Sequence, residues 1–143
     1  MITRVWTATD DNSNSKTYTQ TITVVDTTAP TFTTSPASVT VQCSASTAPS
    51  ATGTAVASDN CDDDVTVSYA DTTVAGTGNN SVITRVWTAT DDNSNSATYT
   101  QTITVVDTTA PVADELILAD ITAECSVVTL AVPSATDNCA GLK

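Results

Sequence analysis

Residues 2–30 read ITRVWTATDDNSNSKTYTQTITVVDTTAP, and residues 83–111 repeat this stretch with Ala97 in place of Lys16. The two copies begin about 81 residues apart, and an internal repeat of this length decides the architecture of a chain. Each copy alternates Thr with β-branched and aromatic residues on either side of an Asp/Asn/Ser turn, a pattern typical of a β-hairpin. The sequence therefore predicts repeated β-structure.

Side chains two positions apart on a strand lie on the same face, so the hairpin 83–106 has a predictable inner surface. On the first strand, Ile83, Trp87 and Ala89 share one face, and the stem of Arg85 can lie along the same side. On the return strand, one face carries Tyr99, Gln101, Ile103 and Val105. A Trp on an alternating strand of a sandwich is usually a core residue, so we expect Trp6 and Trp87 to be buried. The alternative is that the two Trp side chains stack on a ligand.

The repeat divides the 143 residues into one complete unit and two partial ones. We expect residues 1–30 to be the final hairpin and linker of a preceding unit, 31–111 a complete unit, and 112–143 the beginning of a following unit. Expected strands are 37–44, 54–58, 65–69, 72–75 and 127–132; expected loops are 44–53, 59–64 and 71–80. Short strands separated by frequent turns indicate an all-β fold of tandem immunoglobulin-like β-sandwich repeats, about 81 residues per unit.

The composition excludes several classes of protein. The formal net charge is −12 with only four Lys and Arg residues, so the chain cannot neutralise a nucleic-acid backbone, and anionic membranes are disfavoured. No apolar run is long enough to cross a membrane. The chain has no histidine to activate a nucleophile, and we expect no enzymatic activity.

The four cysteines are divided equally between the units. The segment 40–43 (TVQC) corresponds to 122–125 (TAEC), and 58–61 (SDNC) corresponds to 136–139 (TDNC). This correspondence predicts disulfides Cys43–Cys61 and Cys125–Cys139, each contributing roughly 3 kcal/mol through loop closure. Disulfides imply an oxidising, extracellular compartment, and we expect the chain to be an excerpt whose signal peptide lies elsewhere. The alternative is free, buried thiols in a cytosolic protein.

Calcium is the metal that the sequence favours. The turns Asp10-x-Asn12-x-Asn14 and Asp91-x-Asn93-x-Asn95 offer oxygens at alternate positions, although both lack the Gly and Glu of an EF-hand. Further candidate ligands are the loop and linker carboxylates of Asp26, Asp59, Asp62, Asp63, Asp64 and Asp107. The alternative is that Asp and Asn are present because their side chains bond the turn backbone.

The motif Thr88-Ala89-Thr90-Asp91, the Asp-Asn-Cys motifs and the Val-Val-Asp-Thr-Thr-Ala-Pro linker resemble hyalin-type (HYR-like) immunoglobulin-like repeats. The resemblance is to tandem repeats of large bacterial surface proteins, including gliding-motility adhesins and extracellular fibres. The chain departs from many such repeats at Asn93-Ser94-Asn95, where they carry Cys or Gly. The resemblance implies an extracellular sandwich with an adhesive or scaffold role and no enzymatic activity.

Two functions follow from this reading. The first is a structural unit of a cell-surface fibre, in which a hairpin such as 1–30 is too small to be stable alone and pairs with strands of other copies, head to tail. The second is an adhesin module that binds a glycan or a solid surface through loops 59–64 and 71–80. Calcium could stiffen the linkers in either case.

Overall fold

The computed structural model describes residues 1–115, 120, 122, 124–125 and 132–139. The strands are β1 (Ile2–Thr9), β2 (Ser15–Ile22), β3 (Thr31–Thr34), β4 (Val39–Gln42), β5 (Val56–Ser58), β6 (Thr66–Ala75), β7 (Ser81–Thr90), β8 (Ser96–Val106), β9 (Val112–Ala113) and β10 (Ala135–Thr136). One short helix, α1 (Pro49–Thr52), lies between β4 and β5. The chain is nearly all β with several sheets, which confirms the predicted fold class.

Unit 31–111 contains a four-stranded sheet in the order β4-β8-β7-β6 and a two-stranded sheet of β3 and β5. Strand β4 is parallel to β8, and the other neighbours are antiparallel. The rings of Phe32 on β3 and Tyr99 on β8 lie 6.0 Å apart between centroids, and the Tyr99 hydroxyl donates to the Pro36 carbonyl at 3.0 Å. These contacts join the short sheet to the long one.

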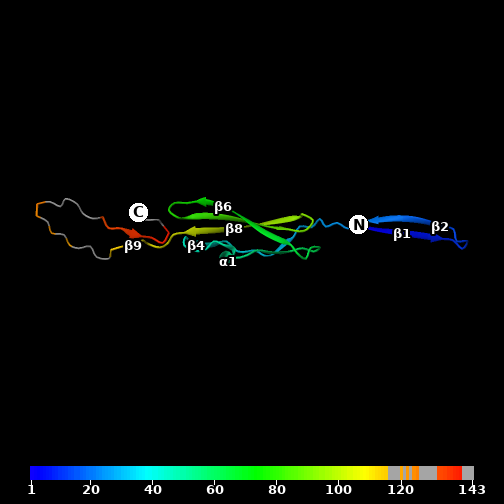
Figure 1. Cartoon of the computed structure of the whole chain (residues 1–143), viewed down its shortest axis with the longest axis horizontal. Helices are drawn as coiled ribbons and strands as arrows, with labels where there is room; N and C mark the ends of the chain where they lie inside the picture. Colours follow the sequence, from blue (N-terminus) through cyan, green and yellow to red (C-terminus); the bar gives the residue numbers. More distant parts are fainter. Residues whose placement is uncertain (116–119, 121, 123, 126–131, 140–143) are drawn as a thin grey trace.

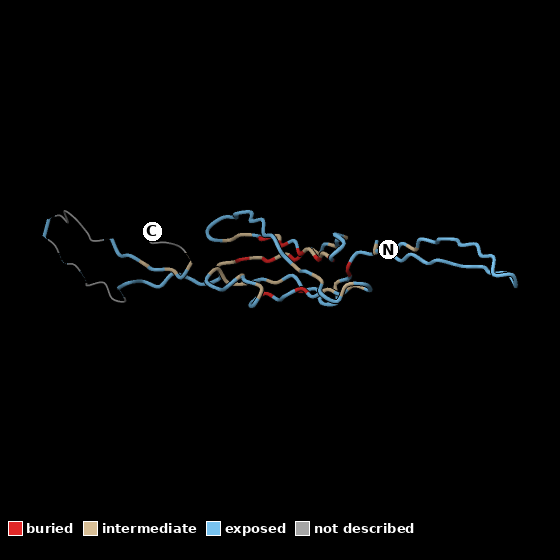
Figure 2. The backbone as a smooth tube through the Cα atoms, turned by 45° about the vertical axis from the view of Figure 1, so that its right-hand side comes forward, coloured by how far each residue is buried: buried red, intermediate tan, exposed pale blue. Residues whose placement is uncertain are grey.

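The core lies on the inner face of β7 and β8, as the alternation predicts. Ile83, Trp87 and Ala89 of β7 are buried together with Ile103 and Val105 of β8. Strand β4 closes this cluster with apolar side chains of intermediate burial. Figure 2 shows that the buried residues are concentrated in the central unit, whereas the hairpin before it is almost entirely exposed.

Two polar side chains are also fully enclosed in this core. The guanidinium of Arg85 donates to both carboxylate oxygens of Asp71 on β6 at 2.8 Å and stacks on the ring of Tyr69, 4.6 Å from its centroid. Gln101 donates to the carbonyls of Ala37 at 3.0 Å and Thr52 at 2.8 Å. Buried polar groups are tolerated when their hydrogen bonds are made, and these two side chains tie β7 and β8 to neighbouring segments.

Hairpin β1–β2 has the same register as β7–β8 but a different environment. Arg4 faces Gln20 just as Arg85 faces Gln101. Trp6 is nevertheless 56% exposed, whereas Trp87 is 2% exposed, so the prediction of a buried Trp is wrong for Trp6. The described strands pair β1 only with β2, and the hairpin projects from one end of the central unit (Figure 1).

Strands β9 and β10 lie beyond the opposite end of the four-stranded sheet from the hairpin β1–β2 (Figure 1). The two strands pair Val112 with Thr136 and Ala113 with Ala135. In the repeat, these are the positions that pair Thr31 with Ser58 and Phe32 with Ala57 in β3 and β5. The ladder of β9 and β10 therefore has the same register as the ladder of β3 and β5.

Three local predictions need correction or lie outside the structure. The predicted loop 44–53 contains α1, because Pro49 at the first helical position starts a turn that Gly53 ends. The predicted strands 65–69 and 72–75 are one strand, β6, because it pairs continuously with β7 from Thr66 to Ala75. The predicted strand 127–132 lies almost entirely outside the described residues.

Candidate functional site

Two clusters of candidate functional residues lie at the two ends of the segment 31–111, and a further candidate set, Asp10, Asn12 and Asn14, lies in the β1–β2 turn. At the end nearer the hairpin β1–β2, carboxylate oxygens of Asp26 and Asp59 and the Sγ of Cys61 lie within 4.8 Å of one another. At the other end, the same distance encloses the carboxylate of Asp107 and the sulfurs of Cys43 and Cys139. We call these clusters the upstream junction and the downstream junction.

The turns with alternating Asp and Asn are held by their own side chains. Asp10 Oδ1 accepts from the backbone N–H groups of Asn12 at 3.0 Å and Asn14 at 2.8 Å, and the Asn14 side chain donates to Asp10 Oδ2 at 2.9 Å. Donation by Asn14 lowers the pKa of the Asp10 carboxyl. The predicted turn chemistry is therefore present, and calcium binding at these residues stays a prediction.

Asp91 forms the same arrangement in the second copy, next to the upstream junction. Asp91 Oδ1 accepts from the backbone of Asn93 at 3.0 Å and of Asn95 at 2.7 Å, and the Asn95 side chain donates to Oδ2 at 2.8 Å. Partial burial tends to raise the pKa of this carboxyl, but the hydrogen bonds outweigh burial and lower it. The amides of Asn93 and Asn95 also reach Asp26, at 3.5 and 3.4 Å, so the turn contacts the linker of the preceding unit.

In the acidic loop at 59–64, some carboxylates accept hydrogen bonds from the backbone and others are exposed to solvent. Asp62 accepts from the backbone of Asp64 at 2.9 Å and of Asp92 at 3.0 Å, which ties the loop to the turn of β7–β8. Asp59 Oδ1 accepts from the Cys61 backbone at 2.9 Å, whereas its Oδ2 is buried with no hydrogen-bond partner among the described residues. Asp63 is exposed. Of the predicted calcium ligands, the structure thus brings Asp59 close to Asp26, which the amides of Asn93 and Asn95 also reach.

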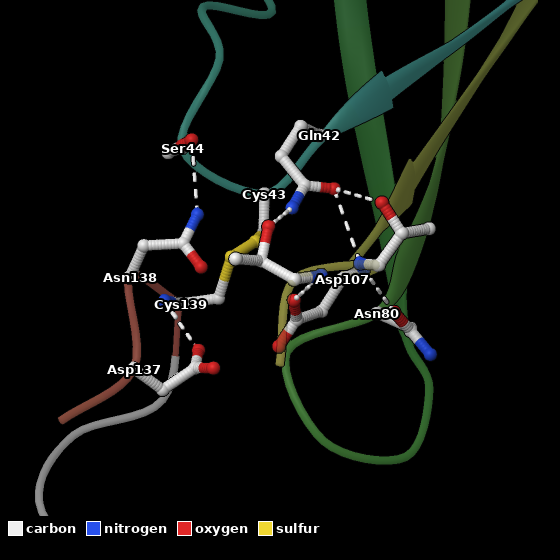
Figure 3. Close-up of a disulfide and its surroundings, with 10 residues drawn as sticks. Gln42, Cys43, Ser44, Asn80, Asp107, Asp137, Asn138 and Cys139 are labelled. Carbon is white, nitrogen blue, oxygen red and sulfur yellow. Dashed lines mark hydrogen bonds between the residues drawn. A yellow bond between two sulfur atoms is a disulfide. The ribbon is translucent and has the colours of Figure 1, made fainter. Parts of the chain in front are cut away.

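The downstream junction carries a disulfide between Cys43 and Cys139 (Figure 3). Their Cα atoms are 5.8 Å apart, although 96 positions separate them in the sequence. The predicted pairs Cys43–Cys61 and Cys125–Cys139 are therefore wrong, and Cys61 and Cys125 are exposed free thiols. The physical reason is that β4 carries Cys43 to the end of the unit opposite Cys61, where the loop of the next unit meets it.

Hydrogen bonds that the sequence did not suggest hold the linker against this disulfide (Figure 3). Gln42 donates to the Thr109 hydroxyl at 2.6 Å and accepts from the Thr108 backbone at 3.2 Å. Asn80 accepts from the backbone of Asp107 at 2.8 Å. In the sequence, the feature that points to this linker-binding role of Gln42 is its position immediately before Cys43.

Loop 71–80 was predicted to contact a ligand. In the structure, its first part belongs to strand β6 and the rest forms the turn between β6 and β7. Asp71 belongs to β6 and binds Arg85, so it is structural. Residues at the β6–β7 turn, including Gly76 and Asn80, line an open hollow of about 190 Å³. Binding of a glycan or surface here stays a prediction. Among the described residues, no helix has the length and apolar character needed to cross a bilayer.

The comparisons with known proteins agree with this architecture. A search of curated proteins finds no significant match. A family model described as an HYR-like domain with four cysteines matches residues 31–105, more than half of the chain. Domains of this kind are non-enzymatic, adhesion-type modules that are typically extracellular. The repeated hairpin, the sandwich of unit 31–111 and the cysteines at its junctions are thus the features of a chain that belongs to the HYR-like domain family.

Proposed function

We propose that the chain is a structural repeat of an extracellular, cell-surface fibre in which HYR-like units follow one another in series. The bacterial surface adhesins that its sequence resembles are the context in which we place it. The observation that carries the proposal is the exposure of β1–β2, a hairpin whose duplicate β7–β8 forms the core of the central unit. The same hairpin sequence is buried in one copy and exposed to solvent in the other, so we expect the exposed copy to pack against further β-strands.

The exposed hairpin is costly to leave in water. Trp6 and Tyr18 are 56% and 71% exposed, and Ile2 and Val5 are also more than half exposed. Burial of a large apolar side chain contributes roughly 1.5–3 kcal/mol, and an isolated hairpin is marginally stable at best. Docking onto further strands would bury several of these side chains of β1–β2, and each would contribute roughly 1.5–3 kcal/mol to the stability of the hairpin.

Residues 112–139 of a second copy are the partner we propose. They form the β3–β5-like ladder in the correct register and, in the described residues, have no hairpin corresponding to β7–β8. Residues 1–30 of the neighbouring copy would supply that hairpin by strand complementation. Strand β6 lies at the edge of its sheet, so the order β4-β8-β7 can form without a counterpart of β6.

A head-to-tail contact of this kind does not close on itself, so it extends into a filament. We expect the molar mass from light scattering, measured without added oxidant or reductant so that Cys43–Cys139 stays formed, to rise with protein concentration. Electron microscopy should show units arranged in a line.

Trp6→Ser should abolish the rise of molar mass with concentration without changing the unfolding of the central unit, because Trp6 contacts solvent in the single chain. The matched change Trp87→Ser should instead unfold the central unit, because the same side chain is buried there.

A constant monomer mass for the wild-type chain at every concentration, equal to that of Trp6→Ser, would contradict complementation between copies. Retention of the wild-type chain on a glycan array or a solid surface by the loops alone would support the adhesin module instead.

Calcium stiffening of the upstream junction is a second candidate, favoured by one observation. Asp59 Oδ2 is buried without a partner, close to the carboxylate of Asp26. A hard cation prefers such oxygens, and binding to the folded state alone raises its stability. We expect calcium to raise the melting temperature relative to a chelator, and Asp59→Asn to remove the difference. An unchanged midpoint for the wild-type chain would remove this candidate.

A further inference from the structure

Among the described residues, the upstream junction repeats the downstream junction without a counterpart of Cys43. Asp26 corresponds to Asp107 in the repeated linker, and Cys61 corresponds to Cys139 in the repeated Asp-Asn-Cys motif. In each junction the carboxylate and the thiol or disulfide lie within 4.8 Å. The downstream junction also holds Cys43, at the end of β4, bonded to Cys139.

The hydrogen bonds of the two junctions match as well. The Thr28 backbone donates to Asp26 Oδ1 at 3.0 Å, and the Thr109 backbone donates to Asp107 Oδ1 at 3.1 Å. The loops also match: the backbone of Cys61 donates to Asp59 Oδ1 at 2.9 Å, and that of Cys139 to Asp137 Oδ1 at 2.8 Å. The loop that presents the Cys61 thiol is therefore already folded as in the bonded junction.

By the repeat, the position that Cys43 holds in the downstream junction would be held in the upstream junction by a strand cysteine of a preceding unit. Asp59 Oδ2, buried without a partner, and the exposed thiol of Cys61 mark the place where that strand would lie. Cys125 is the strand cysteine of the partial unit, because 122–125 corresponds to 40–43, and it is also an exposed free thiol. Of the two free cysteines, Cys61 thus corresponds to Cys139 and Cys125 corresponds to Cys43 of the internal disulfide.

We propose that Cys61 of one copy and Cys125 of a second copy form an intermolecular disulfide that repeats Cys43–Cys139 at every contact between copies. This inference rests on the proposed head-to-tail assembly. Docking of residues 1–30 onto 112–139 of the neighbouring copy would bring the upstream junction of the first chain to the strand cysteine of the second. In a fibre built in this way, each of these disulfides joins two neighbouring units, and none lies within a single unit.

The bond requires a disulfide oxidant, either a small molecule such as oxidised glutathione or a protein disulfide. One cysteine thiolate attacks the oxidant and releases one thiol, and the second thiolate displaces the other thiol from the mixed disulfide. One sulfur–sulfur bond forms between the chains, the two cysteines lose two electrons and two protons, and the oxidant is reduced to two thiols. Partial desolvation raises the pKa of the Cys61 thiol, and the charges of Asp26, Asp59 and Asp91 raise it further, so the exchange should be faster at higher pH.

The pairing can be tested with two single variants, because each leaves one of the two free cysteines. The chain is prepared with Cys43–Cys139 formed, as peptide mapping can verify, and exposed to oxidised glutathione. Alone, Cys61→Ser and Cys125→Ser should form disulfide-linked homodimers only slowly, as seen on a non-reducing gel. Their equimolar mixture should give a dimer that contains only Cys61–Cys125, at least about tenfold faster than either variant dimerises with itself, because docking raises the effective concentration of the correct pair.

Wild-type chain should give a ladder of covalent oligomers under the same conditions, and Cys61→Ser/Cys125→Ser should give none. Homodimers forming as fast as the mixed dimer, or an intrachain Cys43–Cys61 bond, would overturn the inference. Light scattering of Cys61→Ser/Cys125→Ser, without reductant so that Cys43–Cys139 stays formed, separates it from the proposed function. Wild-type chain that assembles without a Cys61–Cys125 bond in oxidant refutes the cross-link alone, whereas a Cys61→Ser/Cys125→Ser chain that stays monomeric at every concentration refutes the assembly.

Discussion

Replacement of Arg85 by Ala should destabilise the central unit far more than the same change at Arg4, although the surrounding hairpins are duplicates. The Arg85 side chain, 2% exposed, donates to Asp71 twice, to the Thr52 hydroxyl at 2.9 Å and to the Thr47 carbonyl at 2.8 Å. Removing one partner of a buried ion pair typically costs about 3–5 kcal/mol. The Asp71 side chain is 31% exposed and can be rehydrated, which places the expected loss near the lower end, about 3 kcal/mol.

Arg4 provides the matched control because it occupies the same position in β1. It is exposed, and the contact recorded for its guanidinium is the Trp6 ring, 5.5 Å away at the centroid. Exposed cation–π contacts are worth about 0.5–1 kcal/mol, and this one lies outside the central unit. Arg4→Ala should therefore leave the free energy of unfolding of that unit within about 0.5 kcal/mol of wild type.

Urea denaturation followed by Trp fluorescence measures both changes, in a Trp6→Phe background so that only Trp87 reports. Arg85→Met serves as a second variant, since it keeps an apolar stem while removing the charge. If Arg85→Ala and Arg4→Ala shift the midpoint equally, the buried guanidinium does not stabilise the sandwich and the reasoning fails.

Three further predictions concern the same unit. Gln101→Leu should cost about 2–4 kcal/mol, because it leaves the buried carbonyl of Thr52 and the part-buried carbonyl of Ala37 without their donor, whereas Gln20→Leu should be nearly neutral; urea midpoints of the pair decide this. Gly53→Ala should lower the melting temperature by several degrees, because Gly53 has φ 100° and an added Cβ would lie 2.7 Å from Pro36; an unchanged melt would show that the turn can relax. Donation from Arg85 lowers the pKa of Asp71 in the folded state, so this stabilisation is present above the usual carboxyl pKa and is lost as pH falls below about 4. Asp71→Asn should flatten the acid limb of the stability curve measured by calorimetry, and an unaltered limb would assign acid unfolding to other carboxyls.

The inner faces of the long strands could be read from the sequence because they follow a local rule. Side-chain direction alternates along any strand, so the buried positions of β7 and β8 were predictable without knowledge of what covers them. The turns at Asp10 and Asp91 were predictable for the same reason, since their hydrogen bonds join residues two and four positions apart. The extent of β6 was missed because its pairing with β7, and not its own residues, carries it past Ala70.

The sequence by itself determined the all-β class, the repeat and the alternating core, because these depend on residue type and local spacing. Only the tertiary structure decided which sulfurs meet and which copy of the hairpin is buried. Cys43 has Cys61 in its own unit and Cys139 in the next, and the direction of β4 makes the distant one its neighbour. Trp6 and Trp87 have the same local sequence and different exposure, because burial depends on the strands that surround a residue and not on the residue itself.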